Sequence, residues 1–439
     1  MRRPQLLALS ALAALALCLA VGIAIYNIPT VNDRLYPRID RFISGIREVI
    51  APAPETVPTA APIANLPTFA PAPTQTPNFK SQTPNPTTQP PSPTLIPIVY
   101  ELPASISLSG ARYEPQLYNN CGPATLTAAL VYWGWRGAEP DPDNDLTWTH
   151  LEDVRWQREV AAAIKPKQSD KNVMPYELGN FAEEYAGLKY IIRYGGDVDM
   201  IRRFVANGFP VIIERGFREE EHGQSGQGWE GHYGLITGYD DSARRFITQD
   251  SFKGVNYVRD YDLVVRDWRD FNYLYLILYS PDRESEALAL LGPDADVTAN
   301  LNNALVKAQA EAAQSTDPAD LAFDWFNVGT SLQLLGRNDD AALAFDQARS
   351  YNTLPYRMLW YQTFMYKAYF YSERYQEVID LANVTLQTPG LEESHYWRGW
   401  AHHEFGDLDR AAADMRAALD AHPDWDQALS VLAEWGVSP

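Results

Sequence analysis

The chain has 439 residues, which is more than one ordinary domain and fits two or three. Apolar residues make up 46% of the sequence and aromatic residues 12%, so the chain can bury substantial cores. Its 36 basic residues stand against 56 acidic ones, a net charge of −20. This balance argues against nucleic-acid binding, which needs a basic surface, and against docking on anionic lipid through a basic face.

The first segment, residues 1–25, contains an uncharged apolar run from Leu6 to Ile25. As a helix, this run would extend about 30 Å, the thickness of a bilayer core. We therefore expect an uncleaved transmembrane anchor. A cleaved signal and a buried soluble helix are the alternatives.

Basic residues around this run suggest an orientation. Arg2 and Arg3 favour a cytoplasmic amino terminus, although Arg34 and Arg38 on the other flank weaken the bias. We expect a single-pass protein of the cell membrane with the bulk of the chain outside the cytoplasm.

Residues 26–51 are expected to form an amphipathic juxtamembrane helix. Its apolar residues recur at helical spacing, which predicts one face packed on the protein or the membrane. A dedicated partner site is the alternative. The residues are Leu35, Ile39, Phe42, Ile43, Ile46, Val49 and Ile50.

Residues 52–98 form a Pro/Thr-rich tract in which only Glu55 and Lys80 are charged. Such a composition cannot bury a core, so we expect a disordered, extended linker of up to about 3 Å per residue. A spacer of this kind suits an extracytoplasmic stalk.

Residues 99–292 carry helical patterns early and short apolar runs typical of strands late, which favours an α+β domain. The expected helices are Ala124–Trp133, Tyr176–Ala186 and Val198–Ala206, and the expected strands are Pro210–Arg215, Tyr233–Tyr239, Phe246–Thr248 and Tyr273–Tyr279.

The motif Asn-Asn-Cys-Gly-Pro places Cys121 at a predicted helix start, because Pro123 is tolerated only in a first helical turn. The positive end of the helix dipole there favours thiolate, the form that acts as a nucleophile. The other cysteine, Cys18, lies in the apolar run, so no disulfide framework is expected. The alternative is that Cys121 is a small buried hydrophobe.

The candidate base is His232, which starts a predicted strand next to glycine, where a rigid element can aim it. Asp250 ends the next predicted strand. If the two strands are antiparallel neighbours, they bring His232 and Asp250 to one edge, and the carboxylate would orient the imidazole. The alternatives are a structural histidine and a surface aspartate.

Gln116, five residues before Cys121, can place an amide beside the nucleophile. Together with the Cys121 backbone N–H it would form an oxyanion hole. Asn119 and Asn120 are rivals for this role.

These motifs resemble the bacteriocin-processing (double-glycine) peptidase-like family, which is peptidase family thirty-nine of the papain clan. The resemblance is carried by Gln116–Leu126, by Gly231-His232-Tyr233 with Gly238-Tyr239-Asp240, and by Gln249-Asp250-Ser251. It implies a papain-like fold over residues 99–292, with Cys121 as nucleophile, His232 as base, Asp250 as orienting residue and Gln116 as oxyanion donor.

Two departures limit what the resemblance implies. The glutamine stands one residue nearer the cysteine than in the exporter-linked members, and the gap of 111 residues from Cys121 to His232 is longer than theirs. The extra length includes residues 170–176, an insertion that could shape a substrate cleft. The chain has no nucleotide-binding signature, so specificity for a double-glycine leader does not carry over.

No metal or cofactor is expected. The sequence has no His-x-x-x-His or multi-cysteine spacing typical of zinc sites, and no glycine-rich phosphate loop.

Residues 298–436 are predicted to be an all-α solenoid of tetratricopeptide repeats. Equivalent small residues recur 70 positions apart, which is twice 35 and close to the 34-residue unit. Stacked helix pairs present a surface for a protein partner, and bracing of the preceding domain is the alternative. The recurring pairs are Gly329 and Gly399, Gly336 and Gly406, Ala341 and Ala411, and Ala348 and Ala418.

The sequence therefore predicts a membrane-anchored, extracytoplasmic cysteine peptidase that acts on a peptide or protein substrate and carries a repeat domain for a protein partner. Two rivals stay open. One is an inactive peptide-binding scaffold, and the other is an acyl transferase or amidase that uses the same residues.

Overall fold

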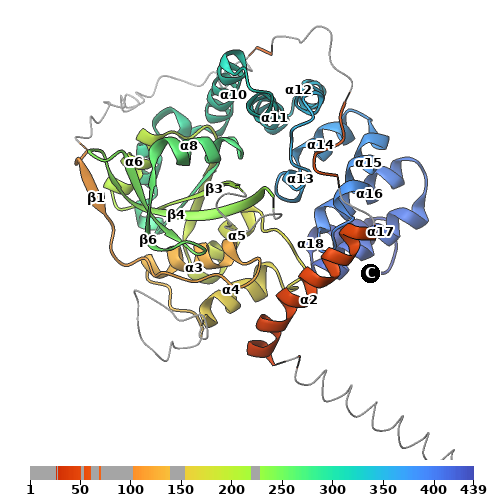
Figure 1. Cartoon of the computed structure of the whole chain (residues 1–439), viewed down its shortest axis with the longest axis horizontal. Coiled ribbons are helices and arrows are strands. Elements are labelled where there is room, and N and C mark those ends of the chain that lie inside the picture. The colour runs from red at the N-terminus through yellow and green to blue at the C-terminus, as the bar shows by residue number, and fades with distance from the viewer. Residues whose placement is uncertain are drawn as a thin grey trace, which may run out of the picture.

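The computed structural model describes residues 26, 28–50, 54–60, 69–70, 102–138, 154–218 and 228–439. It consists of a sheet covered by helices on both faces, followed by an all-helical region (Figure 1). Within these residues, none of the helices is both long and apolar enough to cross a membrane. The predicted span Leu6–Ile25 lies outside them.

The sheet is antiparallel and has the order β2-β7-β3-β4-β5-β6, with β1 paired to β4. The central strands β3 and β7 are buried along their whole length, because helices cover both faces. The strands are β1 (Ser105–Ser107), β2 (Lys189–Arg193), β3 (Val211–Phe217), β4 (Glu230–Asp240), β5 (Arg245–Asp250), β6 (Gly254–Asp260) and β7 (Tyr275–Tyr279).

The two faces of the sheet bury different helices. The first face packs against α3 (Cys121–Tyr132), α4 (Arg155–Ile164) and α5 (Pro175–Ala186). The second packs against α6 (Val198–Ala206), α8 (Tyr261–Arg269) and α9 (Glu284–Leu291). Side chains alternate along each strand, so Ile212 and Leu235 enter the first core and Ile213 and Ile236 the second.

The expected α+β class is confirmed for this domain. Helix α6 has the predicted bounds, and the four predicted strands are present with shifted ends. No sequence pattern predicted β1, β2 and β6, or the helices α4, α8 and α9.

The C-terminal part is helical, as predicted. Gly329 of α11 packs on Phe345 of α12, and Gly399 of α16 packs on Met415 of α17, so the 70-residue spacing joins two equivalent helix pairs. Their assignment to tetratricopeptide repeats stays a prediction. The elements are 3₁₀ turns η2 (Pro281–Arg283) and η3 (Gly292–Ala295), and helices α10 (Val297–Gln314), α11 (Pro318–Leu334), α12 (Asn338–Ser350), α13 (Met358–Tyr361), α14 (Phe364–Tyr371), α15 (Tyr375–Thr385), α16 (Glu392–Glu404), α17 (Leu408–Ala421) and α18 (Asp426–Glu434).

Residues 54–60 and 69–70 depart from the expectation that the whole Pro/Thr-rich tract is an extended linker. Val57 is buried, and its N–H donates to the Leu354 carbonyl at 2.8 Å. Phe69 is also buried, and its carbonyl accepts from Gln309 at 2.6 Å. These short stretches dock on the helical region because each offers an apolar side chain and a backbone group that finds a partner.

Helix α2 (Pro29–Ile50) is present where the amphipathic helix is predicted. Its polar side contacts the domain: Asp33 pairs with Arg158 of α4 and accepts from Gln168. Of the two predicted settings for its apolar side, packing on the protein is not seen among the described residues, and packing on a membrane stays a prediction. Phe42 is 69% exposed and Ile50 is 77% exposed.

Candidate active site

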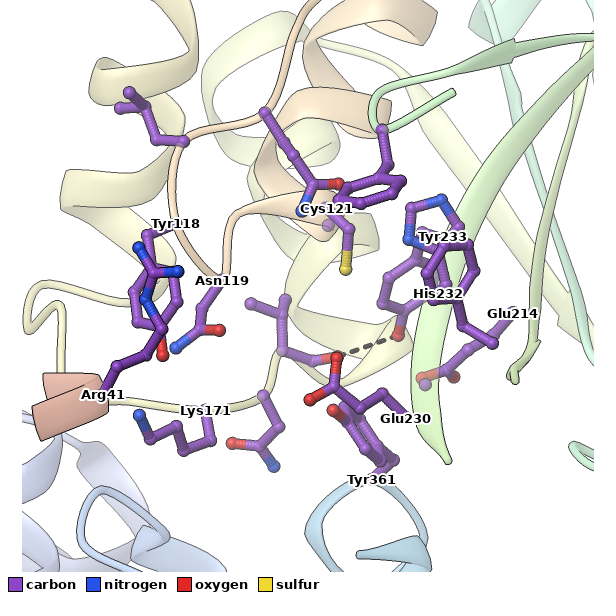
Figure 2. Close-up of a pocket in the computed structure, with 18 residues that line it drawn as sticks. Arg41, Tyr118, Asn119, Cys121, Lys171, Glu214, Glu230, His232, Tyr233 and Tyr361 are labelled. Carbon is purple, nitrogen blue, oxygen red and sulfur yellow. Dashed lines mark hydrogen bonds between the residues drawn. The ribbon is translucent and has the colours of Figure 1, made fainter. Parts of the chain in front are cut away.

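A pocket of about 390 Å³ opens where α3, β3 and β4 meet α2 and α13 (Figure 2). The sulfur of Cys121 points into it, with His232, Tyr233 and Glu214 on one side and Asn119, Arg41 and Lys171 on the other. The predicted residues Cys121, His232 and Gln116 all line this pocket.

Local chain geometry places Cys121 at the first position of α3. Asn119 adopts a left-handed conformation with φ of 57°, which turns the chain into the helix. Gly122 allows the helix start to approach β4 closely, because a Cβ there would lie 3.3 Å from the Cβ of Val173 and 3.5 Å from the Tyr233 ring. Pro123 occupies the first turn, as predicted.

Strands β4 and β5 bring His232 and Asp250 together. Leu235 pairs with Gln249 in the antiparallel register, so the start of β4 faces the end of β5. The Nε2 atom of His232 lies 3.2 Å from Oδ1 of Asp250. The Cys121 thiol interacts electrostatically with His232, and Nδ1 is the ring nitrogen that the contact with Asp250 leaves for it.

Asp250 is held in its ionised form. Its Oδ1 accepts the backbone N–H groups of Phe252 at 3.0 Å and Lys253 at 2.8 Å, and Arg215 approaches Oδ2 at 3.3 Å. Burial alone would raise the pKa of Asp250. The neighbouring His232, Arg215 and the Lys253 N–H instead hold this pKa well below its usual range.

The thiol and the imidazole favour the charged pair. Burial alone would raise the pKa of Cys121, but His232, the Tyr233 backbone and Lys165 lower it. Burial alone would lower the pKa of His232, but Asp250 and Cys121 raise it to about 9. Both shifts favour a thiolate beside an imidazolium over the neutral pair.

Gln116 is held by Ser251. Its N–H donates to the Ser251 carbonyl at 3.0 Å, and its Oε1 accepts from the Ser251 hydroxyl at 2.8 Å. This contact leaves the Nε2 end of the Gln116 amide as a donor in the pocket. Its rival Asn119 also lines the pocket, and among the described atoms its Nδ2 has no acceptor; Asn120 does not line the pocket.

The segment that contains this site is similar to known proteins. Residues 109–277 match the model of the Peptidase_C39 like family. This segment is a C39-like domain. A crystal structure from Bacillus anthracis, described as a C39-like peptidase, is similar at 15% identity and a TM-score of 0.30, over 40% of this chain and 98% of that one. A search of curated proteins gives no match.

Glu214 is a site residue that was not predicted from the sequence. It lies in β3 of the C39-like domain, opposite Tyr233, and is 2% exposed. Burial raises its pKa well above the usual range, although the hydrogen bond with Tyr233 lowers it, so the site favours the protonated carboxyl. An acidic residue directly after the apolar run Val211–Ile213 was the signal that could have revealed it.

Segments outside the C39-like domain complete the pocket wall. Tyr361 of α13 packs on Gly231, where a Cβ would lie 2.9 Å from its ring. On the opposite side, Asp40 of α2 accepts from Tyr118 at 2.8 Å and pairs with Lys171 at 2.9 Å. No local sequence pattern predicts these contacts.

The predicted insertion reaches the pocket, where Lys171, Asn172 and Val173 line it. Its loop is held by the buried Lys165, which donates to the carbonyls of Asn119 at 2.8 Å and Asp170 at 2.9 Å. Among the described residues, the group of side chains spaced to hold a metal ion lies outside this pocket.

Proposed function

We propose that this protein is a cysteine peptidase in which Cys121 is the nucleophile, His232 the base and Asp250 the orienting residue. One observation carries the proposal: a thiol at a helix N-terminus shares a pocket with an imidazole, and that imidazole contacts a buried carboxylate. The match of the surrounding segment to a C39-like family supports it.

The proposed reaction is acyl transfer to the thiol and then to water. The Cys121 thiolate attacks the peptide carbonyl carbon, and the oxyanion accepts hydrogen bonds from Gln116 Nε2 and the Cys121 N–H. His232 donates its proton to the leaving amine as the C–N bond breaks, which leaves a thioester. His232 then removes a proton from water, whose attack releases the acid and the thiolate.

We also propose that the chain is anchored at a membrane with its bulk outside the cytoplasm. The apolar run Leu6–Ile25 directly precedes α2, and the apolar side of α2 is exposed. A helix with one apolar side suits the lipid interface beside such an anchor. The C-terminal helical region, with its paired helices, is proposed to bind a protein partner.

Thiol labelling of the full chain tests the peptidase proposal. A Cys18→Ala background leaves Cys121 as the single thiol. We expect an electrophilic probe to label this protein quickly at neutral and mildly acidic pH, His232→Ala to label slowly, and Cys121→Ala not at all. Equal slow labelling with and without His232 would overturn the proposal and favour an inactive scaffold.

Peptide turnover separates hydrolysis from transfer. We expect the unlabelled protein, in which the Cys121 thiolate is free, to hydrolyse members of a peptide library. Fast labelling together with acyl transfer to added amines, and no hydrolysis, would favour the transferase rival instead.

A further inference from the structure

A second cluster of chemistry-bearing side chains lies where the C39-like domain meets the helical region. A carboxylate oxygen of Asp170, one of Glu392 and a ring nitrogen of His422 lie within 4.8 Å of one another. Asp170 precedes α5, Glu392 begins α16, and His422 directly follows α17. Their exposed fractions are 0%, 1% and 8%.

Two carboxylate oxygens in this cluster are buried without a donor. Among the described residues, Oδ2 of Asp170 and Oε2 of Glu392 have no hydrogen-bond partner. The Nδ1 atom of His422 lies 3.4 Å from the other oxygen of Glu392. Buried carboxylate oxygens normally find a donor or a metal ion, so these two indicate a missing ligand.

The surrounding charges point to a cation. Two further carboxyl groups, those of Glu393 and Glu177, lie close enough to Asp170 and Glu392 to interact with them electrostatically. The buried ammonium of Lys165 donates to backbone carbonyls and not to these carboxylates. A positive ion at the cluster would offset this buried charge.

We propose that Asp170, Glu392 and His422 bind one divalent transition-metal cation, with Zn²⁺ as the ion that fits. An imidazole nitrogen with two carboxylate oxygens is a ligand set that zinc accepts, whereas Ca²⁺ and Mg²⁺ prefer oxygen ligands alone. The ligands are too far apart in the chain for any spacing motif, which is why sequence analysis predicted no metal.

The ion would join two parts of the chain beside the pocket. Lys171 and Asn172, which follow Asp170, line the pocket. The same loop contacts the helical region directly, because Lys171 N–H donates to Gly390 at 3.1 Å and Asn172 Nδ2 to Glu393 at 3.1 Å. The site is a structural cross-link, independent of whether Cys121 catalyses a reaction.

Metal content of the full, untagged chain tests this proposal. Cys18→Ala and Cys121→Ala remove both thiols, since thiolates also bind zinc. After chelation and dialysis against Zn²⁺, we expect one zinc per chain by mass spectrometry of the metal. Asp170→Asn, Glu392→Gln and His422→Gln should each weaken binding at least about tenfold.

His402→Gln is the matched control. His402 lies on the same helix pair, 3.9 Å from Asp414, but Arg398 already pairs with that carboxylate at 2.6 Å. This variant should keep its zinc.

Thermal unfolding of the thiol-free protein is a second measurement that does not depend on the folding of the ligand variants. Zn²⁺ should raise the Tm of the chelated thiol-free protein, and Ca²⁺ or Mg²⁺ should not. A thiol-free protein that neither retains zinc nor changes its Tm with Zn²⁺ would overturn the proposal. Unchanged zinc binding in Asp170→Asn and His422→Gln would overturn it as well.

Discussion

The Nε2 atom of His232 lies 3.2 Å from Oδ1 of Asp250, and this contact directs the other ring nitrogen toward Cys121. The first prediction follows from it. Asp250→Asn removes the charge that stabilises the imidazolium, so peptide turnover should fall about 10²- to 10⁴-fold. Steady-state kinetics measures the loss.

Asp260→Asn is the control for this change. Asp260 ends the next strand, β6, and pairs with Arg245 at an exposed position. Its substitution should leave turnover unchanged, and a similar loss in both variants would contradict the role of Asp250.

Gln116→Ala should reduce peptide turnover about 10²- to 10³-fold, because it removes one donor to the oxyanion. Alkylation of Cys121 by iodoacetamide forms no oxyanion and should keep its rate. Ser251→Ala, which releases Oε1 of Gln116, should give a smaller loss. If the large loss instead follows Asn119→Ala, the rival residue is the donor.

The pH dependence of activity should follow the thiolate–imidazolium pair. The lowered pKa of Cys121 extends activity to lower pH than an unperturbed thiol would allow, and deprotonation of His232 at about pH 9 ends it. Because the pKa of His232 rises from 6.5 to about 9 on folding, its stabilising effect is complete below pH 6.5 and is lost as the pH rises through about 9.

Tm measurements of the wild type and His232→Gln against pH check the second part of this prediction. The advantage of the wild type should shrink between these two pH values. A constant difference would show that His232 gains no proton affinity on folding.

Asp40→Asn should raise the KM for peptides about two- to tenfold, since it breaks the partly buried pair with Lys171 and the hydrogen bond from Tyr118 at the pocket wall. Labelling of Cys121 by a small probe should not change. Asp33→Asn is the control, because Asp33 ties α2 to Arg158 and Gln168 instead. An equal KM shift in both variants would mean that α2 docking matters and the Asp40 contact does not.

Gly390→Ala should destabilise the protein by more than about 2 kcal/mol, because strain at its φ of 80° adds to a Cβ placed 1.9 Å from the Ser169 carbonyl oxygen. Gly406→Ala has nearly the same φ, 76°, with nothing within 4 Å of the added atom, and should cost only about 1 kcal/mol. Urea unfolding measures both. Equal losses would show that the contact with Ser169 relaxes.

The residues that could be predicted share a local signal. Proline, glycine and the apolar pattern after Cys121 indicated the helix start. Two predicted strands joined by a short turn indicated that His232 and Asp250 meet. Glu214 left a weaker signal as an acid directly after an apolar run. No local sequence pattern indicated Tyr361, because its position in the pocket depends on how the helical region packs against Gly231.

The sequence by itself determined the α+β class, the helical C-terminal part and the position of Cys121 at the start of α3. These features follow from backbone restrictions and side-chain periodicity that act over a few residues. Only the tertiary structure decided that α2 exposes its apolar side, that residues around Val57 dock on the helical region, and that Asp170 meets Glu392 and His422. Such contacts join segments far apart in the chain, and the packing that brings them together leaves no spacing motif.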